Sequence, residues 1–298
     1  MDVATGVSLP LAQPDTPTVP AAAATVEALG FDSVWVGDHL ATGRPLLDSV
    51  VALATAAGAT TRVGLGFGVL QVALRHPAWL AKQVASLQHV SGGRLLLGVG
   101  AGGEVAEEWT AAGIPRRTRG QRTDQILAML PDLLAGKPTT LITEPDAPMV
   151  TLAPEVPMPP LWVGGGSPAA LRRAARYGDG WLASMITPAD LRARTAELAD
   201  LAARMDRPTP RVGALVFLGP VNSAGKNPAR NRFVARLESL GKSPETAARL
   251  VTAGPVDALG ELLAQYVEAG ARQLVLCPVG EDWTAACAAL AEATRQLG

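Results

Sequence analysis

The sequence predicts a (β/α)8 barrel, in which eight parallel strands each lead into a helix. Apolar strand-like runs alternate eight times with helical stretches, and strands that alternate with helices of about 10 to 15 residues pair in parallel. Several runs are continuously apolar, as in Leu95-Leu96-Leu97, which indicates burial on both faces. Glycines and polar residues repeatedly follow the strands, at the end where barrel enzymes place their active sites.

Length and composition agree with one large domain over residues 1–298. The chain has 298 residues with 48% hydrophobic side chains, close to the typical barrel size of about 250 residues. No low-complexity linker divides it. The formal net charge of -1 argues against a nucleic-acid partner, which needs a basic surface.

The same composition predicts a cytoplasmic protein without a membrane partner. Cys277 and Cys287 lack a CxxC motif or a Cys/His ligand set, so a disulfide scaffold is not expected. The first residues lack the positive start and apolar core of a signal peptide. No apolar run reaches the roughly 20 residues that span a bilayer.

The elements follow one another regularly along the chain. Glycine closes the first helix at Gly30, and Ser91-Gly92-Gly93 stops the third, as expected of helix C-termini. The expected strands are residues 3–9, 31–37, 62–70, 94–99, 161–164, 180–184, 211–218 and 273–277. The expected helices are residues 19–29, 45–58, 77–90, 120–135, 169–177, 188–205, 256–269 and 282–297.

Three stretches interrupt this alternation. A long loop is expected after the fourth strand, and the proline-rich residues 139–160 are expected to hold a short hairpin. The largest insertion is expected after the seventh strand, at residues 219–253, with helices near 230–240 and 244–251.

The passage from the fifth strand into its helix predicts an anion site. Three glycines, Gly164 to Gly166, are followed by Ser167 and Pro168. Glycine lets a ligand approach the backbone, Ser is a good N-cap, and Pro suits the first helical turn. Exposed amides at a helix start bind anions, typically phosphate.

Asp38 and His39 follow the second strand, after Trp35-Val36-Gly37. At this end of a barrel strand, His39 could exchange a proton near neutral pH, and Asp38 could position it. The structural alternative is an aspartate that caps the loop and a histidine packed against Trp35. Their place at a strand end favours the functional interpretation.

Glycines also mark the third and fourth strands. Gly64, Gly66 and Gly68 alternate, which weakens a strand unless a ligand or a bulge needs the space. The run from Gly98 to Gly103 fits GxGxxG, but no second strand ending in an acidic residue follows at dinucleotide-fold spacing. The glycines from Gly98 to Gly103 are therefore interpreted as room for a planar ring or chain, with Glu104 close by.

The remaining polar residues receive weaker interpretations. His76 is expected to cap or pack at a helix start, and His89 to interact with a helix C-terminus. The three histidines lack metal-ligand spacing. Asp179 is expected to be structural, whereas Ser184 and Met185 are candidates for ligand contact.

Taken in order, these segments resemble the bacterial luciferase-like monooxygenase superfamily, especially its coenzyme F420-dependent oxidoreductases. The resemblance covers nearly the whole chain. It rests on residues 30–39, 62–69, 91–100, 119–124, 161–181, 253–256 and 266–270. The loop after His39 and the seventh-strand insertion are both short, which puts the substrate class in doubt rather than the fold.

The resemblance implies a flavin or deazaflavin at the C-terminal face of the barrel and a homodimer. It implies a non-prolyl cis peptide at Gly68-Val69 behind the ring, and backbone amides of Gly165, Gly166 and Ser167 on the cofactor phosphate. The residues expected to bind the cofactor are Gly68, Val69, Gly100, Gly164, Gly165, Gly166, Ser167 and Ser184. The expected catalytic residues are His39, Asp38 and Glu104.

The predicted function is hydride transfer between coenzyme F420 and a small organic substrate. F420 is favoured over FMN because the Asp38-His39 context and the short chain resemble that branch. The alternatives are an FMN monooxygenase using reduced flavin and oxygen, a flavin-binding protein without turnover, and a non-redox barrel acting on a phosphorylated metabolite. Function must be argued from the site rather than the fold.

Overall fold

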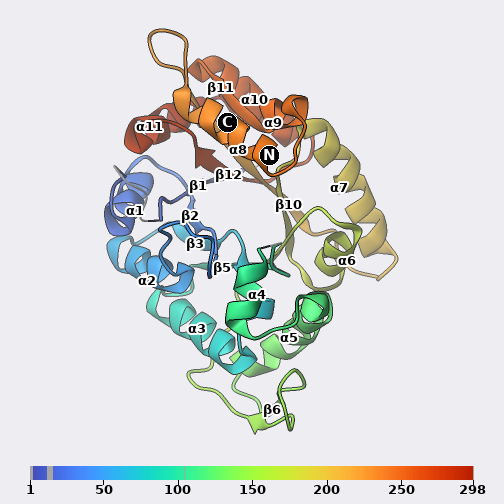
Figure 1. Cartoon of the computed structure of the whole chain (residues 1–298). Coiled ribbons are helices and arrows are strands. Elements are labelled where there is room, and N and C mark those ends of the chain that lie inside the picture. Colours follow the sequence, from blue (N-terminus) through green and yellow to red (C-terminus); the bar gives the residue numbers. More distant parts are fainter. Residues whose placement is uncertain (1–2, 12–15, 104, 298) are drawn as a thin grey trace.

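The computed structural model describes residues 3–11, 16–103 and 105–297. Within these residues, eight parallel strands close into a barrel (Figure 1). The closure is made by pairing of the last barrel strand with the first, Ala4 opposite Gln273, and the predicted (β/α)8 fold is confirmed. In barrel order, the strands are β1 (Ala4–Ser8), β2 (Ser33–Val36), β3 (Gly64–Phe67), β5 (Leu95–Gly100), β8 (Leu161–Gly164), β9 (Gly180–Ser184), β10 (Arg211–Pro220) and β12 (Gln273–Pro278).

Helices surround the barrel strands (Figure 1). Several of them begin at a side chain that caps the first turn, such as Asp48, Ser167 and Asp282. No helix in the described part of the chain is both long and apolar enough to cross a membrane. The helices of the ring are α1 (Val19–Ala28), α2 (Ser49–Ala59), α3 (Pro77–Val90), α5 (Arg119–Leu134), α6 (Pro168–Tyr177), α7 (Pro188–Ala203), α10 (Val256–Glu268) and α11 (Trp283–Thr294).

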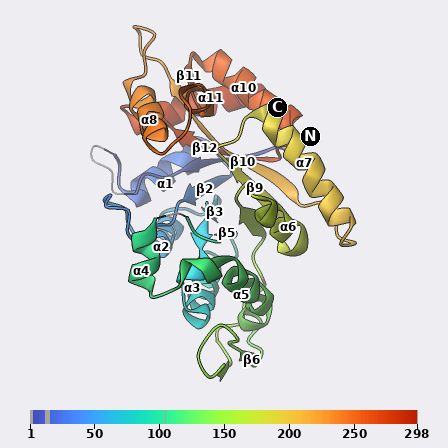
Figure 2. The same cartoon turned by 45° about the vertical axis from the view of Figure 1, so that its right-hand side comes forward.

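The insertions contain both expected and unexpected elements. The hairpin of β6 (Thr139–Thr140) and β7 (Met149–Val150) lies beside α5 and far from α8 (Figures 1 and 2). The seventh-strand insertion holds α8 (Pro228–Ser239) and α9 (Pro244–Leu250), and adds a strand, β11 (Val251–Gly254), that extends β10.

The stretch after the fourth barrel strand was expected to be a loop, but it contains the short helix α4 (Ala106–Ala112). Another unexpected element, β4 (Leu70–Gln71), pairs with β5. The start of α4 has no capping side chain at Val105, and its buried residues are Glu108 and Trp109. A helix with so little apolar surface leaves no periodic pattern in the sequence, which explains why it was missed.

Two tryptophan rings fill the barrel interior and explain part of the glycine pattern. Trp35 and Trp162 meet edge to face, with ring centroids 6.4 Å apart. A Cβ at Gly66 would lie 2.3 Å from the Trp35 ring, and one at Gly180 would lie 2.3 Å from the Trp162 ring. At Gly66 the space therefore holds the Trp35 ring, rather than the ligand or bulge that was considered for the alternating glycines.

A carboxylate contact at a partly exposed position joins α1 to the start of β3 and should make stability depend on pH. The Glu27 carboxylate accepts hydrogen bonds from the amides of Thr61, Arg62 and Val63 at 3.1, 2.7 and 3.0 Å. Partial burial acts to raise the pKa of Glu27, but these amides and the Arg62 charge lower it to about 2. The folded state therefore stabilises the ionised form of the Glu27 side chain over the protonated form.

Because the pKa of Glu27 is depressed in the folded state, its contribution should be complete above the ordinary value of 4.5 and vanish as pH falls to about 2. We expect Glu27→Gln to lower the free energy of unfolding near neutral pH and to match the wild type near pH 2. Urea denaturation across this range measures both curves. Parallel curves would show that the contact does not stabilise the ionised carboxylate.

Candidate active site

The predicted site residues follow the C-terminal ends of five barrel strands. His39 follows β2, Gly68-Val69 follows β3, and Gly100 ends β5. Gly164 ends β8, Gly165 to Ser167 follow it, and Ser184 ends β9. Because parallel barrel strands end on the same face, the fold brings these positions to one end of the barrel. Glu104 lies outside the described residues.

The start of α6 forms an exposed turn suited to an anion. Gly165 has φ +108°, a conformation that other residues rarely adopt, and its carbonyl accepts a 2.8 Å hydrogen bond from Trp181 Nε1. Ser167 caps the helix, its Oγ accepting from the Ala170 amide at 3.2 Å. A Cβ at the exposed Gly166 would meet no atom within 4 Å. A ligand could therefore approach the backbone here without obstruction.

The Gly68-Val69 peptide bond is cis, as the family resemblance implies. The side chain of Val69 occupies the space beside Gly100 and Gly164, two other residues predicted to bind the cofactor. A Cβ at Gly100 or at Gly164 would lie 2.6 Å from a methyl group of Val69. Gly100 and Gly164 thus make room for Val69, and packing rather than ligand contact explains why they are glycines.

His39 contacts a carboxylate that the sequence did not indicate. Its Nδ1 lies 3.1 Å from Oε1 of Glu108, which α4 carries. The His39 side chain is 42% exposed, whereas that of Glu108 is fully buried. A partly exposed imidazole held by a buried carboxylate can exchange protons with a ligand at this end of the barrel.

Asp38 is engaged elsewhere, so its predicted role in positioning His39 is corrected. Arg75 binds both of its carboxylate oxygens, at 2.6 and 2.9 Å. The Ser49 hydroxyl donates to the Asp38 carboxylate at 2.7 Å, and the backbone amide of Gln71 donates to it at 2.8 Å. These donors compensate the burial of the Asp38 carboxylate. They also connect β2 to the start of α2 and to β4.

Gln71 connects the two carboxylate clusters. Its Nε2 donates to the Asp38 carbonyl at 2.6 Å and lies 3.4 Å from Oε2 of Glu108. Its Oε1 accepts from the Gly103 amide at 3.2 Å. The buried Gln71 side chain therefore joins the His39 segment to the glycine loop after β5. Sequence reasoning missed Gln71 because nothing in its local pattern distinguishes it from a strand residue.

The other polar residues fall into two groups. Asp179 accepts from the Leu161 amide at 2.8 Å and is structural, as predicted. His89 lies in the last turn of α3, as predicted. His76 precedes the first turn of that helix, but its side chain forms no capping hydrogen bond. Its Nε2 lies 3.5 Å from Oε2 of Glu144. Ser184 is exposed, and its contact with a ligand stays a prediction. In the described ranges, no three His, Cys, Asp or Glu side chains gather as metal ligands would.

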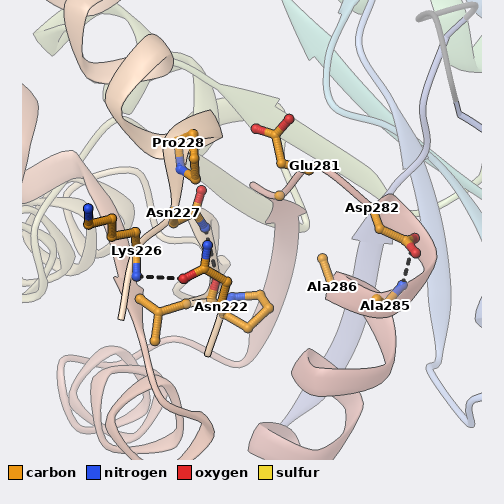
Figure 3. A pocket seen from close by; sticks show the side chains of 11 residues that line it. Asn222, Lys226, Asn227, Pro228, Glu281, Asp282, Ala285 and Ala286 are labelled. Atoms are coloured by element: carbon orange, nitrogen blue, oxygen red, sulfur yellow. Dashed lines mark hydrogen bonds between the residues drawn. The ribbon is translucent and has the colours of Figure 1, made fainter. Parts of the chain in front are cut away.

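A pocket of about 270 Å³ lies beside the ends of β10 and β12, at the starts of α8 and α11 (Figure 3). Three of its polar side chains, Asn222, Asn227 and Asp282, form hydrogen bonds with backbone groups. Asn227 caps α8 and also donates to the Pro220 and Val279 carbonyls. Asp282 caps α11 by accepting from Ala285, as Figure 3 shows. None of the predicted site residues lines this pocket.

The described residues thus form a (β/α)8 barrel with an exposed helix start, a cis peptide and a carboxylate-bound histidine at its C-terminal strand ends. The model of the family described as luciferase-like monooxygenase matches residues 4–237. The chain belongs to the luciferase-like monooxygenase family. This confirms the predicted family.

Sequence relatives include proteins named for F420. An F420-dependent glucose-6-phosphate dehydrogenase of Beutenbergia cavernae is 31% identical over 284 residues, covering 84% of this chain and 83% of the relative. An uncharacterised protein of Mycobacterium tuberculosis is 33% identical over 182 residues, or 54% of this chain. The match spans 62% of that mycobacterial relative, less than two thirds of its length.

Solved structures share the fold at lower identity. An F420-dependent secondary alcohol dehydrogenase in complex with an F420-acetone adduct aligns over 100% of both chains, with a TM-score of 0.82 and 20% identity. The oxygenating constituent of 3,6-diketocamphane monooxygenase of Pseudomonas putida, in complex with FMN, covers 98% of this chain and 97% of its own. Its TM-score is 0.77 and its identity 17%. Both likenesses concern the fold.

Proposed function

We propose that this protein is an oxidoreductase that uses the deazaflavin coenzyme F420 to transfer hydride to or from a small organic substrate. The observation that carries the proposal is the open α6 start at Gly166 and Ser167, at the same barrel end as Gly68-Val69 and His39. The 31% identical relative named for F420 supports the cofactor class. FMN is the second candidate, because a monooxygenase structure of the same fold is a complex with FMN.

The residues present fit a flat cofactor that carries a phosphate. The amides at the α6 start would hold the phosphate, aided by the positive end of the helix dipole. The Gly68-Val69 backbone, with its cis bond at the end of β3, would back the ring. When bound, the cofactor would supply hydride chemistry that no side chain can provide. His39 would bind the substrate and hold or release the compensating proton.

Binding titrations test this proposal. F420 and FMN are added separately to the purified protein, and binding is followed by fluorescence and absorbance. We expect F420 to bind and FMN to bind more weakly. Tight FMN binding without F420 binding would favour the monooxygenase alternative. If neither binds, the proposal fails and a non-redox barrel acting on a phosphorylated metabolite takes its place.

Gly166 offers the sharpest test of the anion site. We expect Gly166→Val to weaken F420 binding by about ten-fold or more, because a branched side chain would cover amides that otherwise approach the phosphate. Stability should change little, since the added Cβ meets no atom within 4 Å. Gly165 is less suitable, because its φ of +108° and its 3.1 Å approach to Ala170 would strain any larger residue.

Gly58→Val is the matched control. Gly58 is also exposed and has open space around its Cβ, but it lies near the end of α2, away from the C-terminal strand ends. It should bind F420 like the wild type. Equal affinity in Gly166→Val, Gly58→Val and the wild type would remove the α6 start from the cofactor site.

A further inference from the structure

We infer that Glu108 is the positioning residue for His39 and that it fixes the ring with its hydrogen on Nδ1, leaving Nε2 as the reacting nitrogen. The catalytic part of this inference rests on the proposed function, whereas the geometric part does not. It assigns a role to a helix, α4, and to a carboxylate that lie 69 residues beyond the histidine in sequence.

A single oxygen of Glu108 gathers the segment that carries His39. Oε1 lies 3.1 Å from His39 Nδ1 and accepts the Leu40 amide at 2.8 Å and the Ala41 amide at 3.4 Å. The carboxylate is fully buried, and Trp109 beside it donates from Nε1 to the Gly103 carbonyl at 3.2 Å. Both the ring and its backbone are thus fixed from one rigid point on α4.

The chemistry of the pair determines which ring nitrogen carries the hydrogen. An ionised carboxylate can only accept hydrogen bonds, so the contact with Glu108 requires a hydrogen on Nδ1. In the neutral imidazole, the lone pair then resides on Nε2. Because a buried partner orients the ring, Nε2 is the nitrogen left to accept a proton from a substrate or to return it.

Anchoring the loop does not by itself explain a carboxylate. A glutamine oxygen could accept the Leu40 amide equally well, and burying a charge is costly unless it is paired. Among the described residues, His39 is the group that forms an ion-pair contact with Glu108. The negative charge at position 108 is therefore paired by the imidazole, while Gln71 Nε2, a neutral donor 3.4 Å from Oε2, completes the hydrogen bonding of the carboxylate.

The tautomer can be measured without any cofactor. The chain has three histidines, so 15N-histidine NMR at mildly alkaline pH gives few ring signals, and His39→Ala assigns those of His39. In the wild type we expect a protonated Nδ1 and a bare Nε2. Glu108→Gln should shift the population toward the Nε2-protonated form, because the amide can donate to Nδ1 as well as accept from it.

Glu107→Gln is the matched control, since Glu107 is the exposed neighbour on the same helix, and it should leave the His39 signals unchanged. A wild-type ring protonated on Nε2 would overturn the inference, and so would a Glu108→Gln spectrum identical to the wild type. If Glu108→Gln does not fold, the wild-type spectrum still decides which nitrogen carries the hydrogen.

Turnover provides the second readout. With F420 and a substrate that the wild type converts, Glu108→Gln should lower kcat by about ten-fold or more, but by less than loss of the imidazole itself. Its F420 affinity should stay within a few-fold of the wild type. A changed tautomer with unchanged kcat would defeat the catalytic part. Failure of the wild type to bind F420 or FMN would instead defeat the proposed function and leave the tautomer result intact.

Discussion

His39→Ala is expected to lower turnover by about 10²–10⁴-fold, the usual contribution of general acid–base catalysis. Hydride transfer to or from a substrate carbon changes the charge on the substrate, and a proton gained or lost at a neighbouring atom must compensate it. In the proposed function, His39, which follows β2 directly, exchanges this proton. The F420 affinity should change no more than a few-fold, because the phosphate is assigned to the α6 start.

The measurement is kcat at saturating substrate, with F420 affinity determined separately by fluorescence. His89→Ala is the control, since His89 is also exposed but stands in the last turn of α3, far along the helix from its start at the strand ends. It should turn over like the wild type. Wild-type turnover in His39→Ala would remove His39 from the mechanism and direct attention to Glu104.

The fold could be predicted from local sequence patterns because its determinants are local. Each strand is a short apolar run between helix stop and start signals, as at Gly30 before β2 or Ser167 before α6. Parallel pairing and barrel closure then follow from the repeated alternation. The hairpin at 139–160 and the helices of the insertion were found for the same reason.

The glycines show where local patterns stop being sufficient. The sequence marked many glycines near strand ends but could not tell which of them face a ligand. Gly66 makes room for Trp35, and Gly100 and Gly164 make room for Val69. At Gly166 the space is open. These differences depend on contacts between strands that are distant in sequence, so they require the assembled barrel.

The Asp38-His39 pair shows the same limit for polar side chains. Adjacency in sequence predicted that the two act together, but their partners lie elsewhere. Arg75 holds Asp38, and Glu108 holds His39. Glu108 was missed because α4 is short and carries almost no apolar periodicity, so neither the helix nor its orientation could be predicted.

Asp38→Asn should lower the free energy of unfolding by about 2–3 kcal/mol. Breaking a buried ion pair usually costs about 3–5 kcal/mol, because the remaining charge stays unpaired. Three features soften the loss here. The Arg75 side chain is 18% exposed, and Asp48 offers it a second carboxylate at 3.9 Å. The asparagine oxygen can also keep one of the hydrogen bonds now made to the carboxylate.

Asp48→Asn is the matched control for this change. It too removes a negative charge beside Arg75, but from an exposed position whose main task is to cap α2 through the Val50 and Val51 amides. Asparagine caps helices as well as aspartate does, so its free energy of unfolding should fall by less than about 1 kcal/mol. Urea denaturation followed by circular dichroism compares the two variants with the wild type.

The stability loss should be confined to Asp38→Asn. The kcat of this variant, per folded molecule, should stay within about ten-fold of the wild type, a smaller loss than general acid–base catalysis usually accounts for. A variant as stable as the wild type but without turnover would place the Asp38 carboxylate in the chemistry itself and return it to the role that its place beside His39 first indicated.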